Sequence, residues 1–90
     1  MVEQDFVIKN KLGLHARPAA VLVQKLSQFK SSIKIMKNDE QIDAKSVMGV
    51  LTLAVSCGET IKFLVDGEDE QEVISVIKEL IDNKFYIEYE

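Results

Sequence analysis

The sequence predicts an α+β fold in which the elements follow the order βαββαβα and the helices pack on one face of an antiparallel sheet. Two observations favour this class. Short segments that alternate apolar and polar residues indicate strands, whereas longer segments with apolar residues three or four positions apart indicate helices. The chain of 90 residues is long enough for one domain, residues 1–90, with one hydrophobic core.

The first strand and the first helix are expected on either side of a loop that contains a glycine. Residues 2–8 alternate in polarity and form the strand, and residues 10–14 form the loop. Pro18 has no backbone N–H to donate, so it belongs in the first turn of the helix. The N-cap of this helix therefore lies within residues 15–17. Its apolar stripe consists of Ala19, Leu22, Val23 and Leu26.

A hairpin and a short helix are expected next. Residues 32–37 and 41–44 form two strands, and the polar pair at residues 38–39 turns the chain between them. Residues 47–54 then form a short helix. Ser46 lies near its N-cap, because a serine oxygen can accept a hydrogen bond from a free amide of the first turn.

One strand and the longest helix complete the order. Residues 60–65 alternate apolar and polar positions and form the strand. Residues 69–85 form the helix, with acidic residues near its start and Lys84 near its end, as the helix dipole favours. The tail at residues 86–90 also alternates in polarity, but the pattern assigns it no role.

Composition limits the kinds of site that the chain can form. With 47% hydrophobic and 29% charged residues, it resembles an ordinary globular domain. Cys57 is the only cysteine, which excludes an internal disulfide and a cysteine-based metal cage, and one histidine leaves little for a metal site. No signal peptide and no apolar segment of membrane length is visible. We therefore expect a cytosolic protein with no metal site and no membrane insertion.

Charge is divided unevenly along the chain. Residues 1–50 contain eight Lys or Arg and five Asp or Glu, whereas residues 51–90 contain three and ten. The mildly basic first half allows a docking face for acidic proteins. No basic stripe with interleaved aromatic residues is present, so direct binding of nucleic acid is not expected. The acidic residues 68–72 have a simpler interpretation as the solvated face of a helix.

The only histidine, arginine and proline of the chain are His15, Arg17 and Pro18. A neutral imidazole is nucleophilic near pH 7, and the free amides and dipole of a helix N-terminus stabilise a phosphate group. Arg17 can hold phosphate oxygens through two parallel hydrogen bonds. Two alternatives stay open: a plain histidine cap beside an ordinary arginine, and a hydrolase site with Ser46. The absence of a G-x-S-x-G segment argues against the hydrolase.

Residues 13–20, GLHARPAA, resemble the active-site signature of the HPr family, the histidine phosphocarriers of the bacterial phosphoenolpyruvate-dependent sugar phosphotransferase system. Residues 45–54, KSVMGVLTLA, resemble the regulatory-serine segment of this family in its Gram-positive form. The similarity extends from Val2 to about Leu80. It implies an open-faced sandwich in which three helices cover one face of four antiparallel strands.

The resemblance implies a carrier of phosphoryl groups with no cofactor, not an enzyme that acts alone. It implies that His15 accepts a phosphoryl group on its Nδ1 atom from phosphorylated Enzyme I and passes it to the IIA domains of sugar permeases. Arg17 is then the partner of the phosphate. The alternatives within the family are a mainly regulatory paralogue of the corepressor type and a carrier of the nitrogen-linked branch.

The resemblance also implies that Ser46 is phosphorylated by an HPr kinase/phosphorylase. A phosphate there adds a charge of roughly −2 at the start of a helix, where free amides can hold it. In Gram-positive relatives the form phosphorylated at this serine also binds a catabolite-control transcription repressor. Judged from the residues alone, Ser46 is a plain helix cap. The resemblance implies that partners dock through Ala20, Val47, Met48, Leu51 and Thr52. We expect a monomer.

Overall fold

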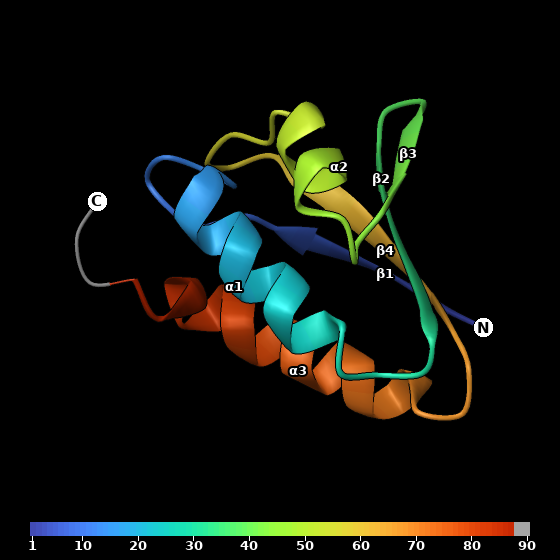
Figure 1. The fold of residues 1–90 in the computed structure, drawn as a ribbon. Coiled ribbons are helices and arrows are strands. Elements are labelled where there is room, and N and C mark those ends of the chain that lie inside the picture. Colours follow the sequence, from blue (N-terminus) through green and yellow to red (C-terminus); the bar gives the residue numbers. More distant parts are fainter. Residues whose placement is uncertain (88–90) are drawn as a thin grey trace.

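The computed structural model describes residues 1–87, and its strands and helices follow the predicted order (Figure 1). Residues 88–90 of the tail lie outside the described residues. The elements are β1 (Val2–Val7), α1 (Ala16–Leu26), β2 (Ser32–Lys37), β3 (Glu40–Asp43), α2 (Val47–Thr52), β4 (Thr60–Asp66), α3 (Glu70–Asp82) and a 3₁₀ turn, η1 (Lys84–Tyr86).

The four strands form one antiparallel sheet in the order β1-β4-β2-β3. The inner strand β4 pairs Ile61 with Phe6 of β1 and Phe63 with Ile35 of β2. Ile35 also pairs with Ile42 of β3, so the hairpin that contains β2 and β3 extends the sheet on one side. The antiparallel α+β class predicted from the sequence is therefore confirmed.

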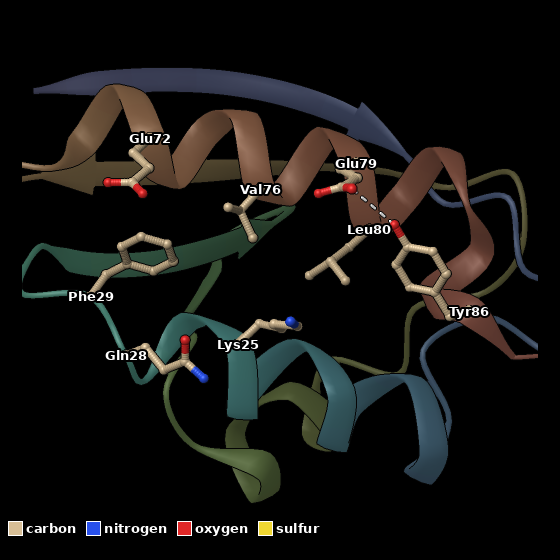
Figure 2. A pocket seen from close by; sticks show the side chains of 8 residues that line it. All are labelled: Lys25, Gln28, Phe29, Glu72, Val76, Glu79, Leu80 and Tyr86. Atoms are coloured by element: carbon tan, nitrogen blue, oxygen red, sulfur yellow. Dashed lines mark hydrogen bonds between the residues drawn. The ribbon is translucent and has the colours of Figure 1, made fainter.

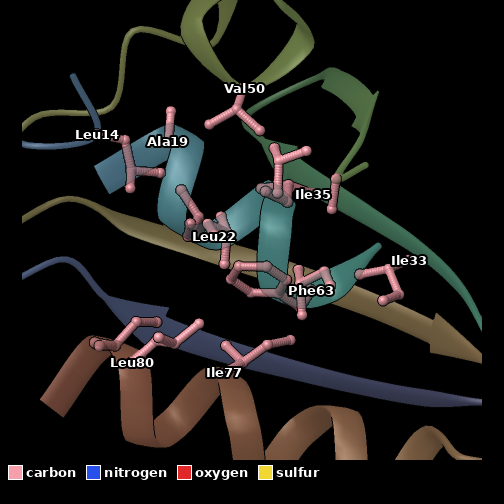
Figure 3. Close-up of a cluster of buried hydrophobic side chains, with 14 of the residues drawn as sticks. Leu14, Ala19, Leu22, Ile33, Ile35, Val50, Phe63, Ile77 and Leu80 are labelled. Carbon is pink, nitrogen blue, oxygen red and sulfur yellow. The ribbon is translucent and has the colours of Figure 1, made fainter. Parts of the chain in front are cut away.

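The three helices cover one face of the sheet, and the core lies between the two layers (Figure 3). On β4, Ile61, Phe63 and Val65 are at most 1% exposed, whereas the alternate side chains of Lys62 and Leu64 are only half-buried. The predicted apolar stripe of α1 packs against this buried face of the sheet. Each fully buried apolar side chain of this size contributes about 1.5–3 kcal/mol relative to an exposed one.

The ends of two helices differ from the prediction. Helix α2 ends at Thr52 instead of Ala54, because Ala54 adopts a left-handed conformation with φ 52°. Helix α3 ends at Asp82 instead of Phe85, so the prediction of a helix over residues 83–85 is wrong.

A left-handed turn replaces the end of the predicted helix. Lys84, Phe85 and Tyr86 have φ angles of 51°, 57° and 58°, a conformation that costs roughly 1–2 kcal/mol for each L-residue. This turn inserts the Phe85 side chain into the core, where it is 1% exposed. Burial of an aromatic ring is worth about 1.5–3 kcal/mol, which offsets much of the cost.

None of the helices in the described residues has the length and apolar character that crossing a lipid bilayer requires.

Candidate functional site

His15 is the N-cap of helix α1, within the range that Pro18 predicts. Its backbone is extended (φ −79°, ψ −170°), and its carbonyl oxygen accepts the first helical hydrogen bond from Ala19 N at 3.0 Å. The imidazole makes no side-chain capping bond. The residue is half-buried, so part of it is exposed to solvent. The His15 side chain therefore does not cap the helix that it begins.

The loop before His15 is docked onto the segment that leads from α2 to β4. Gly13 has φ +71°, and a β carbon placed there would lie 2.1 Å from Val55 O and 2.8 Å from Ser56 Cα. Leu14 N donates to the same Val55 oxygen at 2.9 Å, and the Leu14 side chain is 3% exposed. The backbone immediately before His15 is therefore fixed by contacts that only glycine permits.

The first turn of α1 offers two amide groups to an anion. The backbone N–H groups of Ala16 and Arg17 have no acceptor among residues 1–87, and Pro18 has no N–H at all. Such amides, together with the dipole of an 11-residue helix, attract negative charge. The Arg17 side chain is exposed and makes no ion pair within the described part of the chain. Its guanidinium group is therefore available to a phosphate.

Ser46 is the N-cap of helix α2, as the sequence predicts. Its Oγ accepts a hydrogen bond from Gly49 N at 3.1 Å, and its carbonyl accepts one from Val50 N at 3.0 Å. Gly49 also lies close to β3, because a β carbon there would be 3.3 Å from the Ile42 Cβ. The residue is half-buried. The hydroxyl thus already lies where amides of a helix start can hold an oxygen atom.

The five predicted docking residues lie on α1 and α2, two helices that contact each other. Met48 is 71% exposed, which makes it one of the most exposed large apolar side chains in the described residues. Ala20 and Thr52 are exposed, and Val47 and Leu51 are half-buried. An exposed methionine gives a face that can adapt to several partners, since its side chain is flexible and polarizable.

A brace that the sequence did not predict supports the segment beneath Gly13. Lys37 Nζ donates to the carbonyls of Leu53 and Ala54 at 3.2 and 3.0 Å and forms an ion pair with Glu59 at 3.1 Å. Glu59 also accepts a hydrogen bond from Ser56 N at 2.6 Å. The Ser56 amide first, and Lys37 second, lower the pKa of Glu59. No sequence pattern marks this brace, because its members are up to 22 residues apart.

A hollow of about 410 Å³ lies between α1 and α3 (Figure 2). Tyr86 closes one end of it and donates a hydrogen bond to Glu79 at 3.0 Å, which raises the pKa of Tyr86. Lys25 of its lining lies in the last turn of α1, roughly 15 Å along the helix axis from His15, and Gln28 follows the end of that helix. The hollow is therefore separate from the imidazole. Among residues 1–87 no group of three or more His, Cys, Asp or Glu side chains is arranged to hold a metal ion.

Comparison with known families identifies the chain. The family model for the PTS HPr component phosphorylation site matches residues 2–83. The chain belongs to the HPr family. It is therefore a phosphocarrier of the phosphotransferase system (PTS), not a catalytic enzyme, and the predicted family is confirmed.

Three relatives show how close the match is. The chain is 47% identical over 85 residues to the phosphocarrier protein HPr of Cupriavidus necator, which covers 94% of this chain and 96% of that protein. It is 42% identical over 84 residues to the HPr-like protein Crh of Halalkalibacterium halodurans, with 93% and 100% covered. The crystal structure of HPr-C-His from Thermoanaerobacter tengcongensis superposes with a TM-score of 0.93 at 46% identity and covers 99% of this chain and 100% of that one. The roles of the individual site residues stay predictions.

Proposed function

We propose that His15 accepts a phosphoryl group from phosphorylated Enzyme I and passes it to IIA domains of sugar permeases. In the first step the Nδ1 lone pair forms a bond to phosphorus while the bond from phosphorus to the donor breaks, and the donor leaves with that electron pair. The second step repeats this exchange with the acceptor domain. His15 is thus the group that carries the phosphate between two proteins.

One observation carries this proposal: the half-buried imidazole lies beside two amides that have no acceptor among residues 1–87. The amides of Ala16 and Arg17 can donate to phosphate oxygens, and charge-assisted bonds of this kind are short and strong. The Arg17 guanidinium can add two parallel hydrogen bonds. These donors stabilise the negative charge of the phosphate through hydrogen bonds to its oxygens. They form no covalent bond to phosphorus, so transfer does not have to break one.

The test is phosphorylation with phosphoenolpyruvate and Enzyme I, followed by mass spectrometry of the intact chain and of its peptides. We expect the mass of one phosphoryl group on the peptide that contains His15, and we expect acid to remove it. The matched control is His15→Ala, which should gain nothing. An unmodified wild-type chain, or a phosphate found elsewhere, would contradict the proposal.

We also propose that Ser46 is a regulatory site that an HPr kinase/phosphorylase phosphorylates. Residues 45–54 resemble the regulatory-serine segment of the family in its Gram-positive form. The support is geometric: Ser46 Oγ already accepts the Gly49 amide, so a phosphate oxygen at this place has a donor. The kinase with ATP should modify the wild type and leave Ser46→Ala unmodified. No acid-stable phosphate on Ser46 would contradict this second role.

A mainly regulatory protein of the corepressor type is the second candidate function, and the 42% identity to an HPr-like protein Crh favours it. In that case the form phosphorylated at Ser46 binds a catabolite-control transcription repressor, and transfer through His15 is secondary. Sugar uptake in a carrier-deficient cell separates the two functions. If the chain is mainly a carrier, the wild type should restore uptake and His15→Ala should not. If the chain is mainly a corepressor, neither protein should restore uptake.

A carrier of the nitrogen-linked branch is separated from the sugar branch by its acceptors. We infer that the phosphorylated chain donates to IIA domains of sugar permeases faster than to IIA domains of the nitrogen-linked branch. We also infer that it acts in the cytosol as a monomer, since the docking residues on α1 and α2 must stay accessible. Light scattering of the purified protein should give the mass of one chain.

A further inference from the structure

Asn10 is one of two polar side chains that are fully buried within residues 1–87, and it lies in the loop that leads to His15. Its Nδ2 donates a hydrogen bond of 2.9 Å to the carbonyl oxygen of Lys84, a residue 74 positions away. A buried amide requires such a partner, because its loss from water is otherwise uncompensated. The bond ties the loop to the turn that follows α3.

The same residue also shapes the loop itself. The Asn10 carbonyl accepts a hydrogen bond from Gly13 N at 3.0 Å, and Gly13 rests on Val55. The loop is therefore held on two sides, by the segment after α2 and by the turn after α3. His15 comes directly after this loop, so both contacts restrict where its backbone lies.

The Lys84 carbonyl is available to Asn10 because the chain leaves the helical conformation there. In a continuing α-helix a carbonyl points along the helix axis and accepts a hydrogen bond from the backbone N–H of the residue four positions later. Lys84 instead begins the left-handed turn, with φ 51°, and its oxygen accepts from Asn10 Nδ2 and from Ile87 N at 3.2 Å. Disfavoured backbone conformations persist where surrounding contacts determine them, and they concentrate at functional sites.

A second contact holds the same two segments together. Lys9, next to Asn10, forms an ion pair of 2.9 Å with Asp82, the last residue of α3. The Phe85 ring fills the core beneath the turn and is 1% exposed. Loop and turn therefore share a hydrogen bond, an ion pair and a common core.

We propose that Asn10 is a positioning residue for phosphoryl transfer: through Lys84 it makes the placement of His15 depend on the left-handed turn after α3. This inference rests on the proposed function of His15. Asn10 touches no reacting atom, and its effect is on the geometry in which the imidazole meets the phosphorus. Small errors in such geometry lower rates strongly, since the reacting atoms must be held close to the productive arrangement.

Asn10→Ala tests the proposal, with kcat and KM for acceptance of phosphate from phosphorylated Enzyme I as the readout. We expect kcat to fall roughly tenfold while KM stays within about twofold, because the docking helices α1 and α2 are untouched. Two controls separate position from stability. Asn83→Ala removes an exposed amide-to-carbonyl bond, Asn83 Nδ2 to Glu79 O at 2.8 Å, and Ile77→Val removes one buried methyl group of α3. Both should keep kcat near that of the wild type.

Phe85→Leu tests the same connection from its other end, and it serves if Asn10→Ala fails to fold. A smaller side chain loosens the turn and should also lower kcat, whereas Ile77→Val with a similar loss of stability should not. A wild type that gains no phosphate on His15 would remove the proposed function. A different outcome would overturn only the positioning role. In that outcome the wild type is phosphorylated on His15, but a folded Asn10→Ala or Phe85→Leu variant transfers phosphate as fast as Ile77→Val.

Discussion

The carbonyl oxygen of Val55 lies where a side chain on Gly13 would begin. A β carbon at Gly13 would be 2.1 Å from this oxygen, and the backbone there has φ +71°. The next residue, Leu14, donates its amide to the same oxygen at 2.9 Å. The backbone before His15 is thus held by the backbone of Val55, and this contact determines where His15 lies.

Replacing Gly13 with alanine should displace the loop and slow transfer. We expect a loss of roughly 1–3 kcal/mol in the free energy of unfolding and at least a tenfold lower rate of phosphorylation by Enzyme I. Gly58→Ala is the matched control, because Gly58 also has a positive φ, +88°, but a β carbon there would meet no atom within 4 Å. It should lose some stability and keep the wild-type rate. Equal rates for the two variants would show that the contact with Val55 does not position His15.

The two helix starts of the site could be predicted because their chemistry is local. Pro18 restricts the first turn of α1, and Ser46 supplies an oxygen at the start of α2; the structure places N-caps at His15 and Ser46. The strands were predictable for a similar reason, since alternation of polarity within a few residues reports which face is buried.

The turn after α3 could not be predicted, because contacts from distant parts of the chain determine it. The local pattern favours a helix through Phe85, but in the fold the Phe85 ring enters the core from a left-handed turn, and Asn10 bonds to the Lys84 carbonyl in this turn. The brace from Lys37 to Glu59 escaped prediction in the same way. Sequence spacing records neighbours along one helix or strand and not partners that folding brings together.

Arg17→Lys should weaken transfer without harming the fold. The exposed guanidinium has no ion pair among residues 1–87, so we expect the free energy of unfolding to change by at most about 0.5 kcal/mol. The lysine keeps the charge but loses the planar pair of donors, and the rate of transfer should fall roughly tenfold. Thermal unfolding and single-turnover transfer to a IIA domain measure the two effects. Transfer at the wild-type rate would show that two parallel hydrogen bonds are not needed.

Ser46→Asp should slow phosphorylation of His15 by Enzyme I, mainly by raising KM. The substitution keeps an oxygen that can cap Gly49 N and adds a negative charge beside the exposed Met48, on a face expected to dock an acidic partner. Ser46→Asn is the matched control, because asparagine caps equally well and carries no charge. We expect a several-fold rise in KM for the aspartate variant alone, smaller at high salt. The same KM for both variants would show that charge at residue 46 does not reach the docking step.

Asp69 joins the start of α3 to the connection between α1 and β2. Although it is the N-cap residue of α3, its carboxylate does not cap that helix. It accepts hydrogen bonds instead from Lys30 N at 2.9 Å, from Ser31 N at 3.0 Å and from the Ser31 hydroxyl. The Ser31 hydroxyl first, and the Lys30 amide second, lower the pKa of Asp69 below its ordinary value of 3.8.

Because this pKa is lower in the folded chain than in the unfolded one, the ionised carboxylate stabilises the fold at pH values above about 4, and the stabilisation is lost as the pH falls through the folded pKa. Asp69→Asn should therefore be less stable than the wild type at pH 7 in urea unfolding, and the difference should shrink in acid. Asp39→Asn is the control, since Asp39 is exposed and has no side-chain bond within residues 1–87. A difference between Asp69→Asn and the wild type that is the same at pH 7 and in acid would show that the ionised form of Asp69 is not what holds the Lys30–Ser31 backbone.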